Sequence, residues 1–149
     1  MMNRAKFVYV IYIAARPQAV WNALIDGEAT RRYWAHLNVS DWKVGSTWEH
    51  RRVDGTDQVD LVGTVLESVP PRRLVITWAF PGENADPEKR SRVAFDVELH
   101  AGENTRLTLT HDDLEAGSEM ERGISSGWPL VLSNLKSLLE GDKTMPLRG

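Results

Sequence analysis

The chain has 149 residues, of which 42% are hydrophobic and 26% charged, and it carries a net charge of −3. It has no cysteine, which excludes disulfides, zinc–thiolate sites, iron–sulfur clusters and cysteine nucleophiles. The 18 basic and 21 acidic residues are well mixed, so no nucleic-acid-binding surface is expected. A chain of this length predicts one domain, residues 1–149, with a core of its own.

The segment from Lys6 to Ile13 alternates β-branched and aromatic residues and predicts the first strand. Both of its faces are apolar, so the strand is either covered on both sides or meets a partner with one face, and a homodimer is one option. Its apolar run is too short to span a membrane and does not have the pattern of a signal peptide, which leaves the cytoplasm as the expected location.

Two short helices are expected after this strand. Pro17 suits the first turn of a helix, and the apolar stripe that follows it ends at Asp26-Gly27. A second short helix is expected over residues 28–34. Neither is long enough to cross a sheet, so we expect the two helices to support one end of it.

The middle of the chain predicts about five strands that meander through short hairpins. Residues 38–46 are rich in turn formers, so Trp42 is expected in a loop and partly exposed. The Asp54-Gly55 pair marks a hairpin. The expected strands begin at Thr47 and continue with Val59–Ser68, Leu74–Phe80, Val93–Leu99 and Arg106–His111.

The last long element is expected to be an amphipathic helix from Gly123 to Gly141. Apolar residues recur there at three- and four-residue steps and form a stripe, whereas the polar residues, Asn134 among them, are expected to face away. Gly141 suits the position just after a helix end. Pro129 lacks an N–H, so we expect the helix to bend or to start afresh near it.

This order of elements predicts an α+β fold. A curved antiparallel sheet of about six strands is expected to wrap round the long C-terminal helix, with the two short helices after the first strand. A long helix in the concave face of a strongly twisted sheet leaves a gap that side chains need not fill. The architecture therefore favours a hydrophobic cavity between sheet and helix.

Four runs of the sequence, taken in order, resemble one superfamily. They are ALIDGEATRRYW, LESVPPRRLVITW, SRVAFDVELHAGENTRLTLTHDDL and GWPLVLSNLKSLLEG. The chain is similar to the START-like (SRPBCC) superfamily, and most to its branch named after the activator of the heat-shock protein 90 ATPase. The resemblance covers nearly the whole chain and implies a START-like domain with a helix-grip fold and a hydrophobic cavity. Members bind lipids, hormones or polyketides, and some are enzymes or interaction modules.

The histidines are the main candidates for chemistry. His36, His50, His100 and His111 do not have metal-ligand spacing, so no metal site is predicted. His50 and His111 each share a strand face with large apolar residues, where a histidine orients a polar ligand group or acts as a general base. The alternative is a histidine at the core edge that bonds to a backbone carbonyl. No catalytic residue is assigned, and no nucleotide- or phosphate-binding motif is present, so no cofactor is predicted.

Tryptophan occurs six times in the chain. Large rings line cavities well, but they also fill ordinary cores, and both interpretations stay open. Alternation along each strand and the stripe of the helix place aromatic residues and histidines on faces that we expect to meet. The predicted ligand-binding residues are Trp34, Trp48, His50, Trp78, Phe95, His111, Trp128 and Leu132.

Three functions agree with the sequence. The leading hypothesis is a non-enzymatic binding module that holds an apolar or amphipathic small molecule, lipid-like or aromatic, in the cavity. The second is a protein-interaction module with a stress-response or co-chaperone-like role. The third is a hydrolase, cyclase or dehydratase that uses a cavity histidine.

Overall fold

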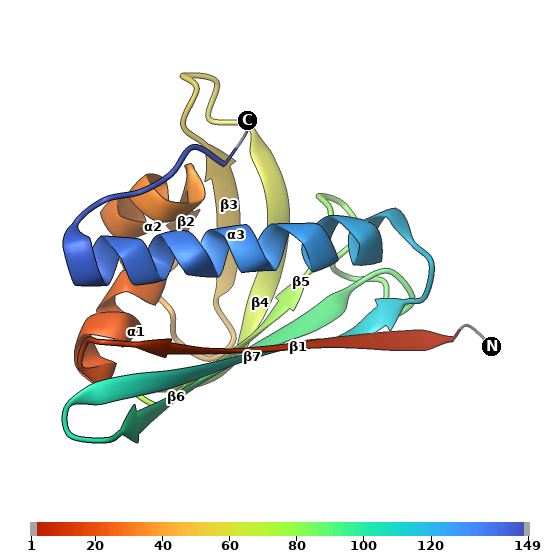
Figure 1. Cartoon of the computed structure of the whole chain (residues 1–149). Coiled ribbons are helices and arrows are strands. Elements are labelled where there is room, and N and C mark those ends of the chain that lie inside the picture. The colour runs from red at the N-terminus through yellow and green to blue at the C-terminus, as the bar shows by residue number, and fades with distance from the viewer. Residues whose placement is uncertain (1–2, 148–149) are drawn as a thin grey trace.

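A computed structural model describes residues 3–147 of the chain (Figure 1). The described part contains, in order, β1 Arg4–Ile13, α1 Pro17–Ile25, α2 Gly27–Trp34, β2 His36–Val39, β3 Thr47–Arg52, β4 Val59–Val69, β5 Arg73–Trp78, β6 Ser91–His100, β7 Asn104–Glu115 and α3 Glu119–Gly141. All neighbouring strands are antiparallel and form one sheet in the order β1-β7-β6-β5-β4-β3-β2. No helix among these residues is long and apolar enough to cross a membrane.

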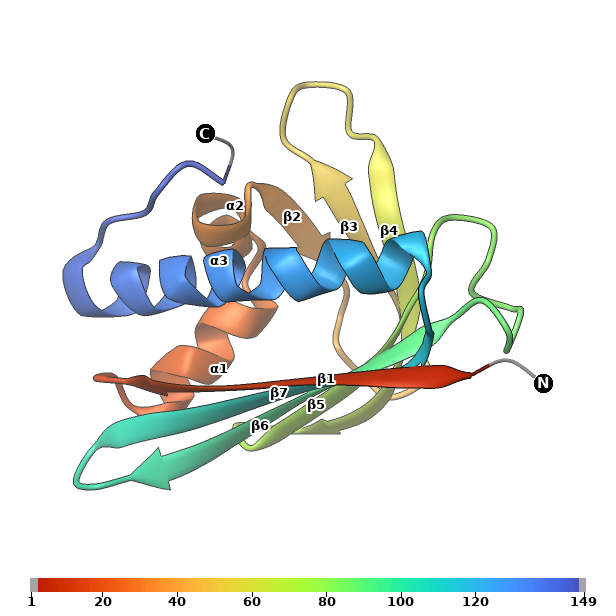
Figure 2. The same cartoon turned by 45° about the vertical axis from the view of Figure 1, so that its right-hand side comes forward.

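The sheet curves around α3, as the two views show (Figures 1 and 2). α3 lies across the concave face, and α1 and α2 lie near its C-terminal half at one end of the sheet. From β2 to β7, consecutive strands are neighbours joined by hairpin connections, which makes them antiparallel, and β1 pairs with the last strand, β7. This α+β arrangement confirms the helix-grip fold that the resemblance implies, with the two short helices in the expected place.

The sheet has one strand more than the sequence predicts. Residues 36–39 form β2, which pairs with β3 at the edge of the sheet. A strand of four residues is too short for its alternation to stand out from chance. It forms because Ala35 takes a left-handed conformation (φ 56°), which ends α2 and turns the chain alongside β3.

α3 extends further at its N-terminus than expected. It begins at Glu119, because the side chain of Ser118 accepts a hydrogen bond from the backbone N–H of Glu121 (3.1 Å). At the other end Asp142 takes the left-handed conformation (φ 55°). Gly141 is therefore the last helical residue instead of the residue beyond the helix.

The fresh start expected at Pro129 is wrong. α3 is continuous from Glu119 to Gly141 and runs unbroken in Figure 1. Proline removes the N–H that would bond to the carbonyl of Ser125, but Ser125 is exposed, so water reaches that carbonyl. Burial of Trp128 and Leu132 on either side of the proline keeps the helix packed on the sheet.

The apolar stripe of α3 faces the sheet as expected. Its residues alternate by three and four and are nearly inaccessible to solvent. They pack into the same core as the inward-facing residues of the strands. The buried apolar residues of the helix are Ile124, Trp128, Val131, Leu132 and Leu135.

Asn134, which is expected to face solvent, is fully buried. Its amide oxygen accepts a hydrogen bond from the backbone N–H of Met145 (2.7 Å). Its amide nitrogen donates to the carbonyls of Met145 (2.8 Å) and Tyr33 (3.3 Å). The segment after α3 folds back over this side of the helix, a tertiary contact that helical periodicity alone does not predict.

Trp42 lies in the loop between β2 and β3, as expected, but it is buried instead of partly exposed. Its indole N–H donates to the carbonyl of Ile25 (3.0 Å). Its ring stacks on that of Trp48, with ring centroids 6.4 Å apart. The loop is therefore anchored to the core by its own tryptophan.

α3 also bonds to the edge strand β1. The ammonium group of Lys136 donates to the carbonyl of Tyr12 (2.6 Å), and the carboxylate of Glu140 accepts from the N–H of Ala14 (2.7 Å). The two side chains form an i,i+4 ion pair with each other (2.7 Å). These bonds attach the C-terminal half of the helix to the end of the strand.

Leu135 is fully buried in the middle of the helix stripe. We predict that Leu135→Ala lowers the free energy of unfolding by about 2–5 kcal/mol, because it leaves a cavity between helix and sheet. Leu130→Ala, on the exposed face of the same helix, should change it by less than about 0.5 kcal/mol. Urea unfolding followed by circular dichroism measures both. An unchanged midpoint for Leu135→Ala would contradict its burial.

Candidate functional site

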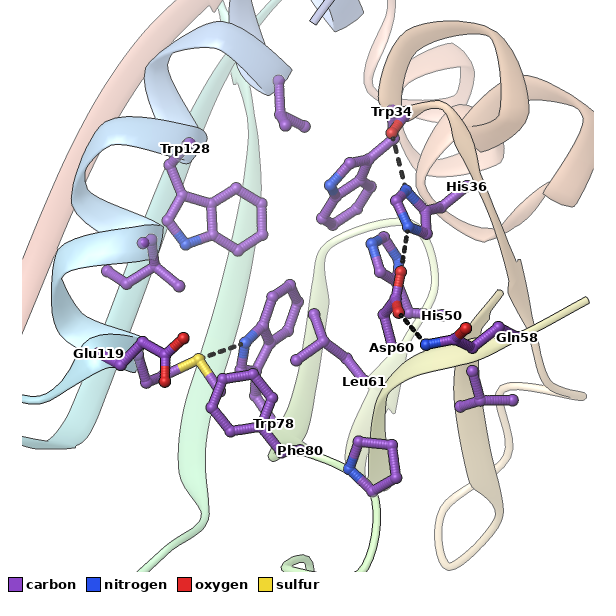
Figure 3. Close-up of a pocket in the computed structure, with 17 residues that line it drawn as sticks. Trp34, His36, His50, Gln58, Asp60, Leu61, Trp78, Phe80, Glu119 and Trp128 are labelled. Carbon is purple, nitrogen blue, oxygen red and sulfur yellow. Dashed lines mark hydrogen bonds and ion pairs between the residues drawn. The ribbon is translucent and has the colours of Figure 1, made fainter. Parts of the chain in front are cut away.

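A pocket of about 630 Å³ opens between the N-terminal half of α3 and the sheet (Figure 3). Its sheet side comes from β2, β3, β4 and β5, with the loop after β5. The end of α2 closes it on a third side. Its lining contains both polar and apolar side chains.

Three indole rings form the inner wall of the pocket. Trp34 comes from the end of α2, Trp78 from β5 and Trp128 from α3, and all three are buried. The ring centroid of Trp128 lies 5.2 Å from that of Trp34 and 5.3 Å from that of Trp78. The centroids of Trp34 and Trp78 are 6.0 Å apart. The rings therefore pack on one another and form a continuous apolar wall.

The sides of the pocket are also apolar. Leu61 from β4, Phe80 from the loop after β5, and Ile124 from α3 line them. On α3, Gly123 and Gly127 face the pocket, and no atom of the neighbouring elements lies within 4 Å of where a Cβ would stand. Part of the space exists because these two helix positions carry no side chain.

The polar end of the pocket is built around Asp60. One of its oxygens lies 2.9 Å from Nε2 of His36 and 2.9 Å from the guanidinium of Arg52. Nδ1 of His36 lies 3.2 Å from the carbonyl of Trp34, so both ring nitrogens face oxygen atoms. Partial burial raises the pKa of Asp60, but the bonds from Arg52 and His36 outweigh it and hold the pKa below its usual value.

His50 stacks on His36, with ring centroids 3.9 Å apart and ring planes inclined by 6°. Its Nδ1 lies 2.5 Å from Oδ1 of Asn38, so Nδ1 carries the proton and Nε2 keeps its lone pair. Every polar side-chain atom of the described residues that is closed to solvent has a bonding partner, and Nε2 of His50 has none among residues 3–147. Nε2 is therefore open to the pocket that His50 lines. Burial, and after it the charge on His36, holds the pKa of His50 well below its usual value.

His111 lies behind the indole wall in a chain of hydrogen bonds. The indole N–H of Trp128 donates to Nδ1 of His111 (3.1 Å), and Nε2–H of His111 donates to the hydroxyl oxygen of Ser91 (2.8 Å). The hydroxyl of Ser91 donates in turn to the carbonyl of Trp78 (2.9 Å). All these groups are paired when His111 is neutral with its proton on Nε2. Burial lowers the pKa of His111 to about 3.

Four of the eight residues predicted to bind a ligand line the pocket, and the other four are buried behind its wall. Those in the lining are Trp34, His50, Trp78 and Trp128. Those behind it are Trp48, Phe95, His111 and Leu132. The faces expected from alternation hold for all of these strand residues, since every one points into the core.

The ring of Trp128 separates several of these residues from the pocket. Phe95 packs edge-on against it, with centroids 5.9 Å apart, and His111 bonds to its N–H. His111 and His50 are both buried, as the alternative of a core histidine expects, but among the described residues they bond to side chains and not to a backbone carbonyl. Leu132 follows one turn later on α3 and is 1% exposed.

Trp48 is turned away from the pocket by its own hydrogen bond. Its side chain passes over Gly63 of β4, the residue that pairs with Trp48. Its indole N–H then donates to the carbonyl of Thr77 on β5 (2.8 Å). A Cβ at Gly63 would stand 1.8 Å from that carbonyl oxygen and 2.2 Å from the indole nitrogen. Only glycine fits at this crossing.

The polar end of the pocket is what the sequence interpretation missed. His36 and Asp60 lie on separate strands, and their contact depends on the register of β2, β3 and β4, which no local pattern contains. Gly123 and Gly127 did leave a signal, because glycines four residues apart lie on one face of a helix and open a groove there.

The lining supplies little for catalysis. Among the described residues around the pocket there is no serine, threonine, tyrosine or lysine. No group of histidine and carboxylate side chains between residues 3 and 147 is placed to hold a metal ion. His50 is therefore a neutral base without a neighbouring hydroxyl or amine to activate.

Comparison with known proteins gives one family match. The family model described as Activator of Hsp90 ATPase homolog 1-like protein matches residues 14–140. No curated protein is similar enough to the chain to count as a match.

Solved structures share the fold at low sequence identity. A protein from Mesorhizobium loti has a TM-score of 0.76 at 22% identity, over 93% of this chain and 99% of that one. The Aha1 dimer from Colwellia psychrerythraea has a TM-score of 0.75 at 21% identity, over 93% and 98%. An Hsp90 activator from Plasmodium falciparum has a TM-score of 0.73 at 24% identity, over 90% and 95%.

We predict that the protein loses stability as the pH falls from about 6.5 to about 4.5. In the unfolded chain a histidine binds its proton near pH 6.5, whereas folded His111 binds one only at a pH of about 3. The unfolded state therefore holds more protons in this window, and the free energy of unfolding falls by up to about 1.4 kcal/mol per pH unit for each buried histidine. Urea unfolding at a series of pH values measures this slope.

In His111→Gln the side-chain amide can still bond to Trp128 and Ser91, but it does not bind a proton in this pH range. It should make the pH dependence shallower, and His50, together with carboxylates such as Asp60 and Glu140 whose pKa values are also held low, should account for the part that is left. His100→Gln, at an exposed position, should leave the slope unchanged. A slope that His111→Gln does not alter would show that His111 titrates normally.

Proposed function

The chain belongs to the family of Activator of Hsp90 ATPase homolog 1-like proteins, and we propose that this START-like member is a non-enzymatic binding module. Its proposed ligand is an apolar or amphipathic small molecule, held between α3 and the sheet. The proposal is carried by the pocket of about 630 Å³, which has a wall of three packed indoles and polar groups gathered at one end.

The size and lining of the pocket support this proposal. Small-molecule sites enclose about 300–1,000 Å³ and combine mostly apolar walls with a few polar groups that fix orientation. Here the indoles and the side of α3 supply the walls, and His36, His50 and Asp60 supply the polar groups. An amphipathic ligand fits this division, with its apolar body against the indoles and its polar end towards the histidines.

An enzymatic role for His50 has less support. A hydrolase, cyclase or dehydratase would use its free Nε2 as a general base. The ring has no hydroxyl nucleophile beside it among the described lining residues, and no metal cluster accompanies it in residues 3–147. Binding without turnover therefore stays the leading proposal.

The outer face of β1 supports a second function, in protein interaction. Val8, Val10 and Tyr12 form an apolar row there, with 51%, 39% and 48% of their surface exposed. We propose a second copy of the chain as the partner for this row, with a cytoplasmic, co-chaperone-like role as the wider setting. Light scattering of the wild type and of Val10→Lys tests it: a dimer that the substitution dissociates supports the proposal, and a monomeric wild type contradicts it.

We predict that Gly127→Leu blocks the pocket. The new side chain enters open space, since nothing lies within 4 Å of the added Cβ, and leucine also favours the helix over glycine by roughly 0.8 kcal/mol. Titration with fatty acids, aromatic polyketides and chalcone-like compounds, followed by tryptophan fluorescence, measures binding. The wild type should respond to at least one class, and Gly127→Leu should lose that response without loss of stability.

Ser126→Leu is the matched control, because it adds the same side chain at the exposed neighbouring position outside the pocket. It should bind as the wild type does. If Gly127→Leu also binds normally, the ligand occupies another place. If no compound binds to the wild type, the binding-module proposal fails and the interaction proposal takes its place.

A further inference from the structure

We infer that the pocket selects a ligand without negative charge that carries a hydroxyl or N–H donor, and that this donor bonds to Nε2 of His50. The inference rests on the proposed function and adds the chemical class of the ligand to it. Three features of the pocket carry it: the orientation of the His50 ring, the apolar rings around that nitrogen, and the charges in the lining.

The orientation of the ring leaves one acceptor for the ligand. Nδ1–H of His50 donates to Oδ1 of Asn38 (2.5 Å). The lone pair on Nε2 is therefore the acceptor that remains for a ligand. His36 does not bond to this nitrogen, because the two rings are stacked and a ring nitrogen makes its hydrogen bond in the plane of the ring. Figure 3 shows the two rings side by side at the edge of the space that the indoles bound.

Apolar rings surround His50 on its inner sides. Trp34 contacts the ring edge-on, with centroids 5.0 Å apart, and the ring of Trp78 lies 6.1 Å away. An acceptor in such surroundings is costly to leave without a hydrogen bond. A ligand body that fills the pocket displaces water from Nε2, so a ligand with a donor regains the lost bond and a ligand without one does not.

The charges in the lining disfavour anionic ligands. None of the described residues that line the pocket is lysine or arginine, so a ligand carboxylate or phosphate has no lysine or arginine to pair with there. The acidic residues are Asp60 and Glu119, and the first of these is bonded to His36 and Arg52.

The test is isothermal titration calorimetry of the wild-type protein with four probes that share one ring system. 2-Naphthol donates a hydrogen bond, 2-methoxynaphthalene only accepts one, 2-methylnaphthalene does neither, and 2-naphthoate is an anion. We expect 2-naphthol to bind about tenfold more tightly than the methoxy and methyl compounds, since they leave Nε2 unpaired. 2-Naphthoate should bind more weakly than all three.

His50→Leu removes the acceptor. It should weaken the binding of 2-naphthol about tenfold, to the level of 2-methylnaphthalene, whose own affinity should change by less than about threefold. His100→Leu is the matched control, because His100 is an exposed histidine outside the pocket. It should keep the preference for 2-naphthol.

The outcomes separate this inference from the proposed function. If 2-methylnaphthalene binds as tightly as 2-naphthol, the pocket binds apolar molecules but the inference is overturned. Equal binding of 2-methoxynaphthalene and 2-naphthol, or tightest binding of 2-naphthoate, overturns it as well. If neither these probes nor the larger panel binds, the proposed function fails. If His50→Leu does not fold, the wild-type series decides by itself.

Discussion

The hydrogen bond from the indole of Trp128 to His111 joins α3 to the sheet at a point that water does not reach. His111 continues the connection through Ser91 to the backbone of Trp78. This chain fixes the indole of Trp128 and the backbone that carries Trp78, and the ring of Trp34 packs on both indoles. A buried network of this kind is costly to leave partly unpaired, so it holds the helix in one rotation and keeps the wall of the pocket in place.

The two halves of α3 differ in what they cover. The C-terminal half buries Leu132 and Leu135 in the core that it shares with the sheet and the two short helices. The N-terminal half presents Gly123 and Gly127 to the β3–β4 side, where no side chain fills the gap. One helix therefore provides both the tight core that stabilises the fold and the open space that a ligand needs.

Local periodicity was enough to predict which way most side chains face. Alternation placed Trp48 and His50 on the inner face of one strand, and both are buried. Local periodicity does not predict the contacts between side chains of different strands. His36 meets His50 and Asp60 only because a strand too short to predict pairs with β3. Likewise, Trp48 crosses Gly63 instead of entering the pocket, because the register of β3 and β4 opens that path.

The bonds from Lys136 and Glu140 to the end of β1 have a consequence for the behaviour of the protein at high concentration. The carbonyl of Tyr12 and the N–H of Ala14 are the groups through which a foreign strand would extend the sheet, and unguarded strand edges are where aggregation begins. Because α3 occupies both groups, sheet-to-sheet polymerisation is blocked at this end of the strand. The helix that bounds the pocket thus also protects this end of β1 against the edge-to-edge pairing that leads to fibres.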